Sequence, residues 1–275
     1  MAAEGTRAIR IGGHAAAYLA ATPRGGRVAS LFRHGLNVLL DADDVPTYVT
    51  VQTSDAALHP WAIEVRQTPT RPAVGSPVRS ARFTIEIVGT RLDLSTAVCA
   101  PLHLVPYDSA QTQRALCNRP VLDQLLAERQ PQSVDSLERE IGAVVARWHA
   151  GEDAACLSDL VGLGPGSTPA GDDILVGVLT ALTAQSLVSS ASARALVELR
   201  ERLPEVRLCT HPASWQMIRA ALDGSFPQPL LDLVAAMANA EPGPLRTAAL
   251  RVLRLGATSG RSLLAGFQSG LAARA

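Results

Sequence analysis

The chain contains no lysine, so all 25 basic residues among its 275 are arginines. Without lysine, no Schiff base can form on a side-chain amine, and the lysine of a phosphate-binding P-loop is missing. Any bound anion must therefore be held by arginine side chains, by backbone amides or by a metal ion.

An excess of positive charge and a long apolar run are also missing. The formal net charge is zero, whereas nucleic-acid binders usually carry a basic surplus that neutralises phosphates. The longest apolar stretch, residues 174–188, is interrupted by polar residues and is shorter than the roughly 18 residues that span a bilayer. The amino-terminal residues lack the apolar segment of a signal peptide. We expect a cytoplasmic protein with no nucleic-acid or membrane partner.

Cysteine is scarce, and its spacing excludes the usual metal motifs. The four cysteines, at positions 99, 117, 156 and 209, form no C-x-x-C pair and no cluster with histidine. A structural zinc site is therefore not expected, and we assign no metal ligands. The pattern predicts small buried cysteines in a reducing compartment.

The pattern of apolar residues predicts an α+β fold. Phe83, Ile85 and Ile87 alternate with polar residues, and further short candidate strands cover residues 27–32, 37–40 and 48–53. From Ser136 onward the apolar spacing becomes helical, with further helices expected at 244–255 and 261–272. We predict an N-terminal antiparallel β sandwich or barrel-like part, residues 1–118, followed by a C-terminal α-helical part, residues 119–275, with the junction within 107–119.

One glycine-rich acidic loop, residues 162–173, carries the functional prediction. It reads Gly-Leu-Gly-Pro-Gly-Ser-Thr-Pro-Ala-Gly-Asp-Asp, and Thr168-Pro169 is typical of a helix start with Thr at the N-cap. Unpaired amides and the positive end of the helix dipole at such a place suit a phosphate or a carboxylate. The residues expected to bind there are Gly164, Gly166, Ser167, Thr168 and Gly171.

Two adjacent carboxylates follow in the first turn of that helix. Asp172 and Asp173 could hold a Mg²⁺ ion that bridges to an anion, or one of them could exchange a proton with the substrate if it is desolvated. We therefore predict a catalytic role for both and treat Mg²⁺ as the candidate cofactor. The alternative is structural, because acidic residues stabilise helix starts and glycines often only form turns.

Three shorter segments offer companion residues. In residues 209–214, Thr210 and Ser214 are candidate binding residues or helix caps, and His211 is a candidate proton carrier that could equally be structural. Residues 256–260 place hydroxyls and amides between two helices, which forms either a second anion site or a simple turn. The candidate binding residues there are Thr258, Ser259 and Gly260.

In the first half of the chain, residues 32–37 offer Arg33, with Asn37, to a carboxylate in a bidentate contact. An arginine at a solvated strand end explains Arg33 equally well. The other histidines, at positions 14, 34, 59, 103 and 149, show no metal-ligand spacing and receive no role.

Together these segments resemble the AllH-like family of oxamate carbamoyltransferase subunits. The resemblance rests on the loop at 162–173, and on residues 30–37, 210–214 and 256–260 in the same order, spanning about residues 27–270. The sequence departs from the family pattern at Ser167, Ala170, Ala257 and Ser262, where the family usually has an apolar residue, Ser, His and Asp. These departures bear on substrate identity.

The resemblance implies a subunit of a carbamoyltransferase complex that acts between oxamate, carbamoyl phosphate and oxalurate, with acyl-CoA synthetase-like protein partners. A small anionic metabolite, a carboxylate or a phosphate, is the expected ligand. Two alternatives stay open: a non-catalytic metabolite-binding or assembly module, and a stand-alone enzyme that acts on another small carboxylate.

Overall fold

The computed structural model describes residues 6–42, 46–68, 72–128, 136–239 and 241–272. The chain forms two compact units, residues 1–102 and 103–275. Strands dominate the first unit and helices the second, which confirms the predicted α+β class and the order of its two parts. The predicted division into domains at residues 118 and 119 stays a prediction.

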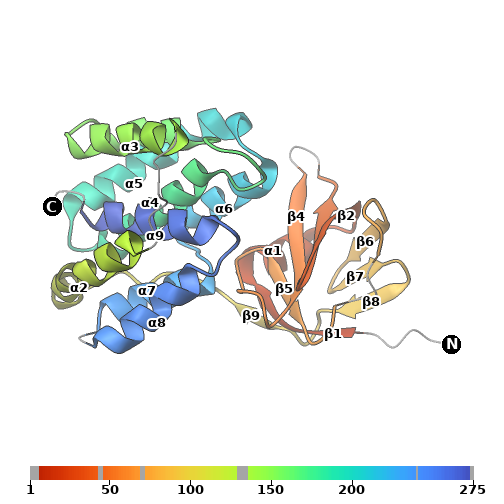
Figure 1. The fold of residues 1–275 in the computed structure, drawn as a ribbon. Helices are drawn as coiled ribbons and strands as arrows, with labels where there is room; N and C mark the ends of the chain where they lie inside the picture. Colours follow the sequence, from red (N-terminus) through yellow and green to blue (C-terminus); the bar gives the residue numbers. More distant parts are fainter. Residues whose placement is uncertain (1–5, 43–45, 69–71, 129–135, 240, 273–275) are drawn as a thin grey trace. The chain divides into compact units, whose positions relative to one another are not determined.

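The β unit contains nine strands and one short helix in its described residues (Figure 1). The helix α1 covers Gly13–Ala21. The strands are β1 (Thr6–Gly12), β2 (Arg24–Phe32), β3 (Gly35–Leu40), β4 (Thr47–Thr53), β5 (Ala62–Val65), β6 (Pro77–Ala81), β7 (Thr84–Ile87), β8 (Thr90–Asp93) and β9 (Val98–Ala100).

The strands form one sheet that closes on itself. Its order is β5-β4-β3-β2-β6-β7-β8-β1-β9, and an additional pairing between β1 and β5 joins eight of the strands into a ring. Most pairings are antiparallel, as predicted, but β4–β5, β1–β8 and β1–β9 are parallel. The barrel-like part is therefore a mixed sheet, and two of its three parallel pairings are made by β1.

Alternation along the strands builds the core of the β unit. Ile85 and Ile87 are buried, as the period of two predicts, and they pack with Leu92 of β8. Phe83, which the same pattern placed in the strand, lies in the preceding turn with φ of 61° and is exposed. The pattern thus predicted the inward face of β7 but overextended the strand.

The helical unit consists of eight α-helices and two 3-10 segments in its described residues. Their bounds are α2 (Ser109–Ala127), α3 (Ser136–His149), η1 (Ala154–Leu160), α4 (Ala170–Gln185), α5 (Ser190–Arg202), η2 (Leu203–Cys209), α6 (Pro212–Leu222), α7 (Gln228–Met237), α8 (Pro242–Val252) and α9 (Ser259–Leu271). In Figure 1, α3 and α8 lie on opposite sides of α4 and α9. None of the helices in the described residues is both long enough and apolar enough to cross a membrane.

Helix α2 occupies the stretch in which the sequence predicts a domain junction. Asp108 and Gln111 form a reciprocal capping box that starts the helix, and the helix continues through Pro120. The capping box is a signal that the sequence carries, but the interior proline argues against a helix there. From Ser109 onward the predicted junction is therefore helical.

Helices α4 and α9 pack at unusually short range because glycines line their contact. A Cβ added at Gly177 would lie 2.2 Å from the Leu263 carbonyl oxygen, and one at Gly266 would lie 2.0 Å from the Ile174 carbonyl oxygen. A Cβ at Gly270 would lie 3.0 Å from the Val178 carbonyl oxygen. Ser259 at the start of α9 bonds Asp173 near the start of α4, and Gln185 at the end of α4 donates to the Gly270 carbonyl oxygen near the end of α9. The two helices therefore run parallel, and their amino ends adjoin.

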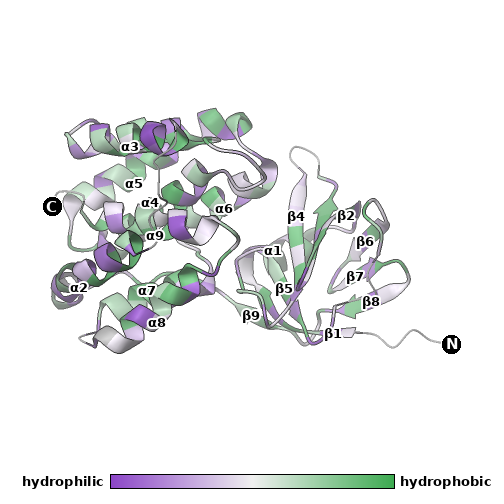
Figure 2. Cartoon of the chain, viewed as in Figure 1, coloured by the Kyte–Doolittle hydropathy of each residue, from purple (hydrophilic) through white to green (hydrophobic). Residues whose placement is uncertain are grey.

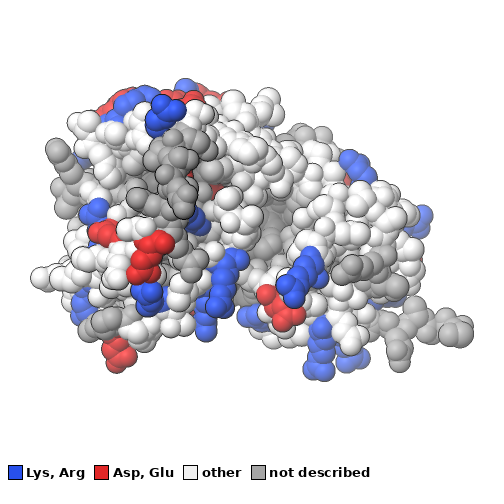
Figure 3. All heavy atoms as spheres, in the orientation of Figure 1, with Lys and Arg blue, Asp and Glu red and all other residues white. Residues whose placement is uncertain are grey.

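Figures 2 and 3 show how hydrophobic and charged residues are distributed over the two units. Hydrophobic and hydrophilic residues are interspersed along most strands and helices of both units (Figure 2). Arginine and acidic side chains are interspersed over the face shown in Figure 3. On that face the charges do not merge into one extended field of a single sign.

Candidate functional site

The loop before α4 has the preset backbone that its glycines predicted. Gly162, Gly164 and Gly166 have φ values of 81°, 117° and 92°, a region that other residues rarely adopt. The cap of α4 is Pro169, which has φ of −54° and ψ of 145° and lacks a side-chain cap bond. The prediction of Thr168 as the N-cap is therefore wrong by one residue, because the helix starts after the proline and not at it.

The exposed part of this loop presents free backbone donors. Amides on either side of the exposed part are satisfied internally: Leu163 N donates to Leu160 O at 3.0 Å, and Gly171 N donates to Leu163 O at 2.9 Å. Within the described residues, no acceptor is assigned to the amides of Gly166, Ser167 and Thr168, and these three residues are exposed. The entrance to α4 is therefore open to an anion.

Asp172 is a structural clamp. It is 1% exposed, and its Oδ1 accepts a 2.7 Å hydrogen bond from the Gly162 amide while its Oδ2 accepts one from the Thr210 hydroxyl. The carboxylate thus ties the start of the glycine loop to the segment before α6. Both carboxylate oxygens of Asp172 are thus engaged by groups of the protein, and its predicted catalytic role stays a prediction.

We predict that Asp172→Ala destabilises the protein by roughly 2–4 kcal/mol, because it leaves two partly buried donors, the Gly162 amide and the Thr210 hydroxyl, without their acceptor. Urea denaturation at pH 7.5 would measure the loss. The exposed Asp153 supplies a control, since Asp153→Ala is expected to change the free energy of unfolding by less than about 0.5 kcal/mol. A loss no larger than that of the control would contradict the clamp.

Asp173 lies in a different environment. Its Oδ2 is enclosed and has no hydrogen-bond partner among the described residues. Burial raises the pKa of Asp173 from 3.8 to about 7; a hydrogen bond from Ser259 lowers it in part, and the charge of Asp172 raises it further. A carboxyl group with a pKa near neutrality can both give and accept a proton under physiological conditions.

Ser259, the first residue of α9, joins Asp173 to the loop. Its hydroxyl contacts the Asp173 carboxyl group and lies 3.4 Å from the Thr168 hydroxyl. Thr258 before it is exposed and has no side-chain cap bond, and Gly260 is buried where a Cβ would lie 2.2 Å from the Val252 carbonyl oxygen. The structure thus brings together Thr168, Asp173, Thr258 and Ser259 from the two predicted segments.

A cavity of about 610 Å³ opens beside these amino ends. Thr168 and Pro165 line it from the loop, and Thr258 lines it from the start of α9. Arg261 supplies a cation: its Nη1 donates to Glu138 Oε1 at 3.0 Å, while its Nε is buried with no partner among the described residues. Sequence reasoning missed Arg261, although its position just after the Thr-Ser-Gly segment is a local signal for an anion ligand.

The segment before α6 has mainly structural contacts. His211 is the N-cap of α6, and its Nδ1 accepts a 3.2 Å hydrogen bond from the Ala213 amide. The capping prediction for Thr210 or Ser214 is therefore wrong: Thr210 bonds Asp172, and Ser214 is buried in α6. The proton-carrier role of His211 stays a prediction.

Arg33 and Asn37 belong to the β unit. Arg33 is exposed in the turn between β2 and β3. Asn37 is on β3, where its Nδ2 donates to Ser30 at 2.9 Å and its Oδ1 accepts from Thr50 at 2.8 Å. The Asn37 side-chain amide is thus engaged in cross-strand hydrogen bonds. The binding roles of Arg33 and Asn37 stay predictions.

The described residues contain no group of three or more His, Cys, Asp or Glu side chains able to hold a metal ion. Asp172 and Asp173 bond different partners, so they do not form the paired carboxylate that suggested Mg²⁺. The cysteine prediction is correct only for Cys156, because Cys99, Cys117 and Cys209 are exposed.

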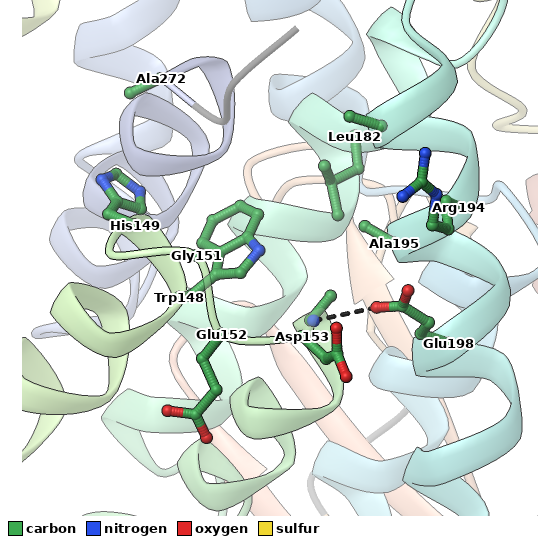
Figure 4. Close-up of a pocket in the computed structure, with 12 residues that line it drawn as sticks. Trp148, His149, Gly151, Glu152, Asp153, Leu182, Arg194, Ala195, Glu198 and Ala272 are labelled. Carbon is green, nitrogen blue, oxygen red and sulfur yellow. Dashed lines mark hydrogen bonds between the residues drawn. The ribbon is translucent and has the colours of Figure 1, made fainter.

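A second pocket, of about 440 Å³, lies between the carboxyl end of α3 and α5 (Figure 4). Trp148 and His149 line it from α3, and Arg194 and Glu198 line it from α5. Glu198 already accepts a 2.9 Å hydrogen bond from the Ala154 amide, drawn as the dashed line in Figure 4. None of the predicted site residues lines this pocket.

Comparison with known families finds a match within the helical unit. Residues 160–271 match the model of the family described as oxamate carbamoyltransferase subunit AllH. The match includes the glycine loop, Asp173, Ser259 and Arg261, and it confirms the predicted resemblance over this part of the chain. Residues 30–37, which also carried the resemblance, lie outside the match. No solved structure matches the chain.

Proposed function

We propose that this chain, whose residues 160–271 match the AllH family, is a subunit of a carbamoyltransferase that binds a small anionic reactant at the adjoining amino ends of α4 and α9. Oxamate is the reactant that the family description names, and carbamoyl phosphate is the second reactant that the resemblance implies. Acyl-CoA synthetase-like proteins, which the resemblance implies as partners, complete the proposed complex. The observation that carries the proposal is that Thr168, whose amide has no acceptor among the described residues, and Arg261 line the same cavity.

Electrostatics favour an anion at this place. Two parallel helices bring two positive dipole ends together, and each end stabilises a negative charge by about 0.3–1 kcal/mol. Arg261 adds a full positive charge whose Nε is still unpaired within the described residues. Glu138 pairs with Nη1 of Arg261, and Nε has no partner among the described residues, so a carboxylate or a phosphate can pair with the guanidinium by a second contact.

The hydroxyls provide a route for a proton. We propose that protons pass between the cavity and the Asp173 carboxyl group through Thr168 and Ser259. When phosphate attacks the carbamoyl carbon of oxalurate, the oxamate nitrogen leaves and needs a proton. In the reverse direction the oxamate nitrogen attacks carbamoyl phosphate, phosphate leaves, and the nitrogen must lose that proton. A carboxyl group with a pKa of about 7 suits both directions.

The proposal predicts that Arg261→Gln weakens the binding of oxamate and of carbamoyl phosphate by about 10-fold to 100-fold, because a charge-assisted hydrogen bond is lost. Isothermal titration of the full chain at low ionic strength measures both dissociation constants. The Arg261–Glu138 pair is partly exposed and contributes little to stability, so the variant is expected to fold.

Arg194→Gln is the matched control, since Arg194 is an exposed arginine of the other pocket. Its affinities are expected to equal those of the unchanged protein. If neither anion binds the unchanged chain, or if both substitutions weaken binding equally, the proposed site is wrong.

A further inference from the structure

The cavity beside the amino ends of α4 and α9 is much larger than a small anion needs. Its volume of about 610 Å³ corresponds to about 20 water molecules at about 30 Å³ each. Pockets of roughly 300–1,000 Å³ are typical of sites for larger organic ligands. Oxamate or carbamoyl phosphate alone would leave most of this space unfilled.

The cavity is also elongated along α9. Arg261, Ala265 and Ser269 line it at successive turns, a span of about 12 Å at 1.5 Å per residue. Glu138 pairs with Arg261 at one end, and Ile141 and Val145 of α3 follow the same direction. The charged residue therefore lies near the amino ends of the helices, and the cavity continues from there between α3 and α9.

Away from Arg261, the wall of the cavity is mainly aliphatic. Ile141 and Ile174 are buried side chains that line it from α3 and α4, and Val145 and Ala265 are partly buried. A wall of this kind is stabilised by covering it with apolar atoms. The cavity thus combines an anion-binding end with an apolar extension.

From this combination we infer that the site binds an amphipathic anion: a carboxylate or a phosphate at the Arg261 end, joined to an unbranched apolar chain that extends along α9. This inference rests on the proposed function, because it extends the substrate class of the same site. The anionic head contacts Arg261 and the amide of Thr168, which both line the cavity. The chain covers Ile141, Val145 and Ala265.

The test measures how affinity depends on chain length. The probes are oxamate and its N-alkyl derivatives from N-methyl to N-hexyl, titrated calorimetrically into the full chain. Each buried methylene is expected to raise the affinity about threefold to fourfold until the cavity is filled. Affinity that stays flat or falls with chain length, while oxamate itself binds, would overturn the inference and leave the proposed function standing.

The variant Gly142→Leu tests whether the alkyl chain lies in this cavity. Gly142 lines the cavity in helix α3, and a Cβ at this position would meet no atom within 4 Å, so a larger side chain is accommodated. Leucine also favours a helix more than glycine does. The variant is expected to bind oxamate normally and to lose the gain in affinity with chain length.

Ala143→Leu is the control, because Ala143 is exposed on the same helix and does not line the cavity. It is expected to keep the full dependence on chain length. A gain with chain length that survives unchanged in Gly142→Leu would place the alkyl chain elsewhere and contradict the inference. Absence of binding by every probe, oxamate included, overturns both the inference and the proposed function.

Discussion

Asp173→Asn is expected to reduce carbamoyl transfer by the reconstituted complex by roughly 10²-fold to 10⁴-fold, the usual contribution of a general acid or base. Asparagine has nearly the same shape, but it cannot exchange a proton with Ser259. Initial rates of carbamoyl phosphate formation from oxalurate, compared at saturating substrate, measure the effect. Turnover within about twofold of the unchanged complex would remove Asp173 from the reaction.

The same substitution is expected to stabilise the fold above neutral pH. The pKa of Asp173 is about 7 in the folded chain and 3.8 as a free group, so the folded protein retains a proton that the unfolded chain releases. The free energy of unfolding therefore falls as pH rises between these two values. From pH 5.5 to 8 the loss is about 2 kcal/mol at most.

Asparagine does not titrate, so the variant lacks this loss. The difference in the free energy of unfolding between Asp173→Asn and the unchanged protein should grow by about 2 kcal/mol from pH 5.5 to pH 8. Urea denaturation at the two pH values measures it. Asp153→Asn, at an exposed position, is the control that should show no such growth. A stability gain that does not depend on pH would contradict the raised pKa.

Gly266→Val is expected to destabilise the helical unit by about 3 kcal/mol or more. A Cβ at Gly266 would lie 2.0 Å from the Ile174 carbonyl oxygen, which belongs to the backbone of the helix packed against it. The two helices can accept the side chain only by moving apart. Because the separation reaches their amino ends, oxamate binding should also be lost under conditions in which the variant is still folded.

Thermal unfolding with and without oxamate measures both effects of Gly266→Val. Gly243→Ala is the matched control, since a Cβ at Gly243 in α8 would meet nothing within 4 Å and alanine favours the helix. It should leave stability unchanged or slightly raised. A Gly266→Val variant with unchanged stability and unchanged oxamate affinity would show that the close contact of α4 and α9 is not required.

The order of strands and helices could be predicted because it depends on local patterns. The alternation around Ile85 and the helical spacing after Ser136 report burial directly, since one face of each element meets the core. The mixed pairing of β1 could not be predicted in this way. Its partners β5, β8 and β9 are far along the chain, and no short-range pattern records them.

The candidate site could be predicted only in part, because local motifs are visible in the sequence and long-range contacts are not. The glycine loop and the Thr-Ser-Gly segment are local motifs, so both were found. Their contact joins Thr168 and Ser259, which are 91 positions apart, and Arg261 meets Glu138 across 123 positions. Sequence reasoning also gave Asp172 and Asp173 the same role, whereas neighbouring positions on a helix face different surroundings. One carboxylate clamps the loop, and the other is desolvated beside Ser259.

Nuclear magnetic resonance of the ¹⁵N-labelled full chain, titrated with oxamate and then with carbamoyl phosphate, can observe each backbone donor separately. Binding at the adjoining helix starts predicts that the largest saturable shifts fall on the amides of Gly166, Ser167, Thr168 and Ser259. Shifts centred on the pocket lined by Trp148, or no saturable shift with either anion, would contradict it.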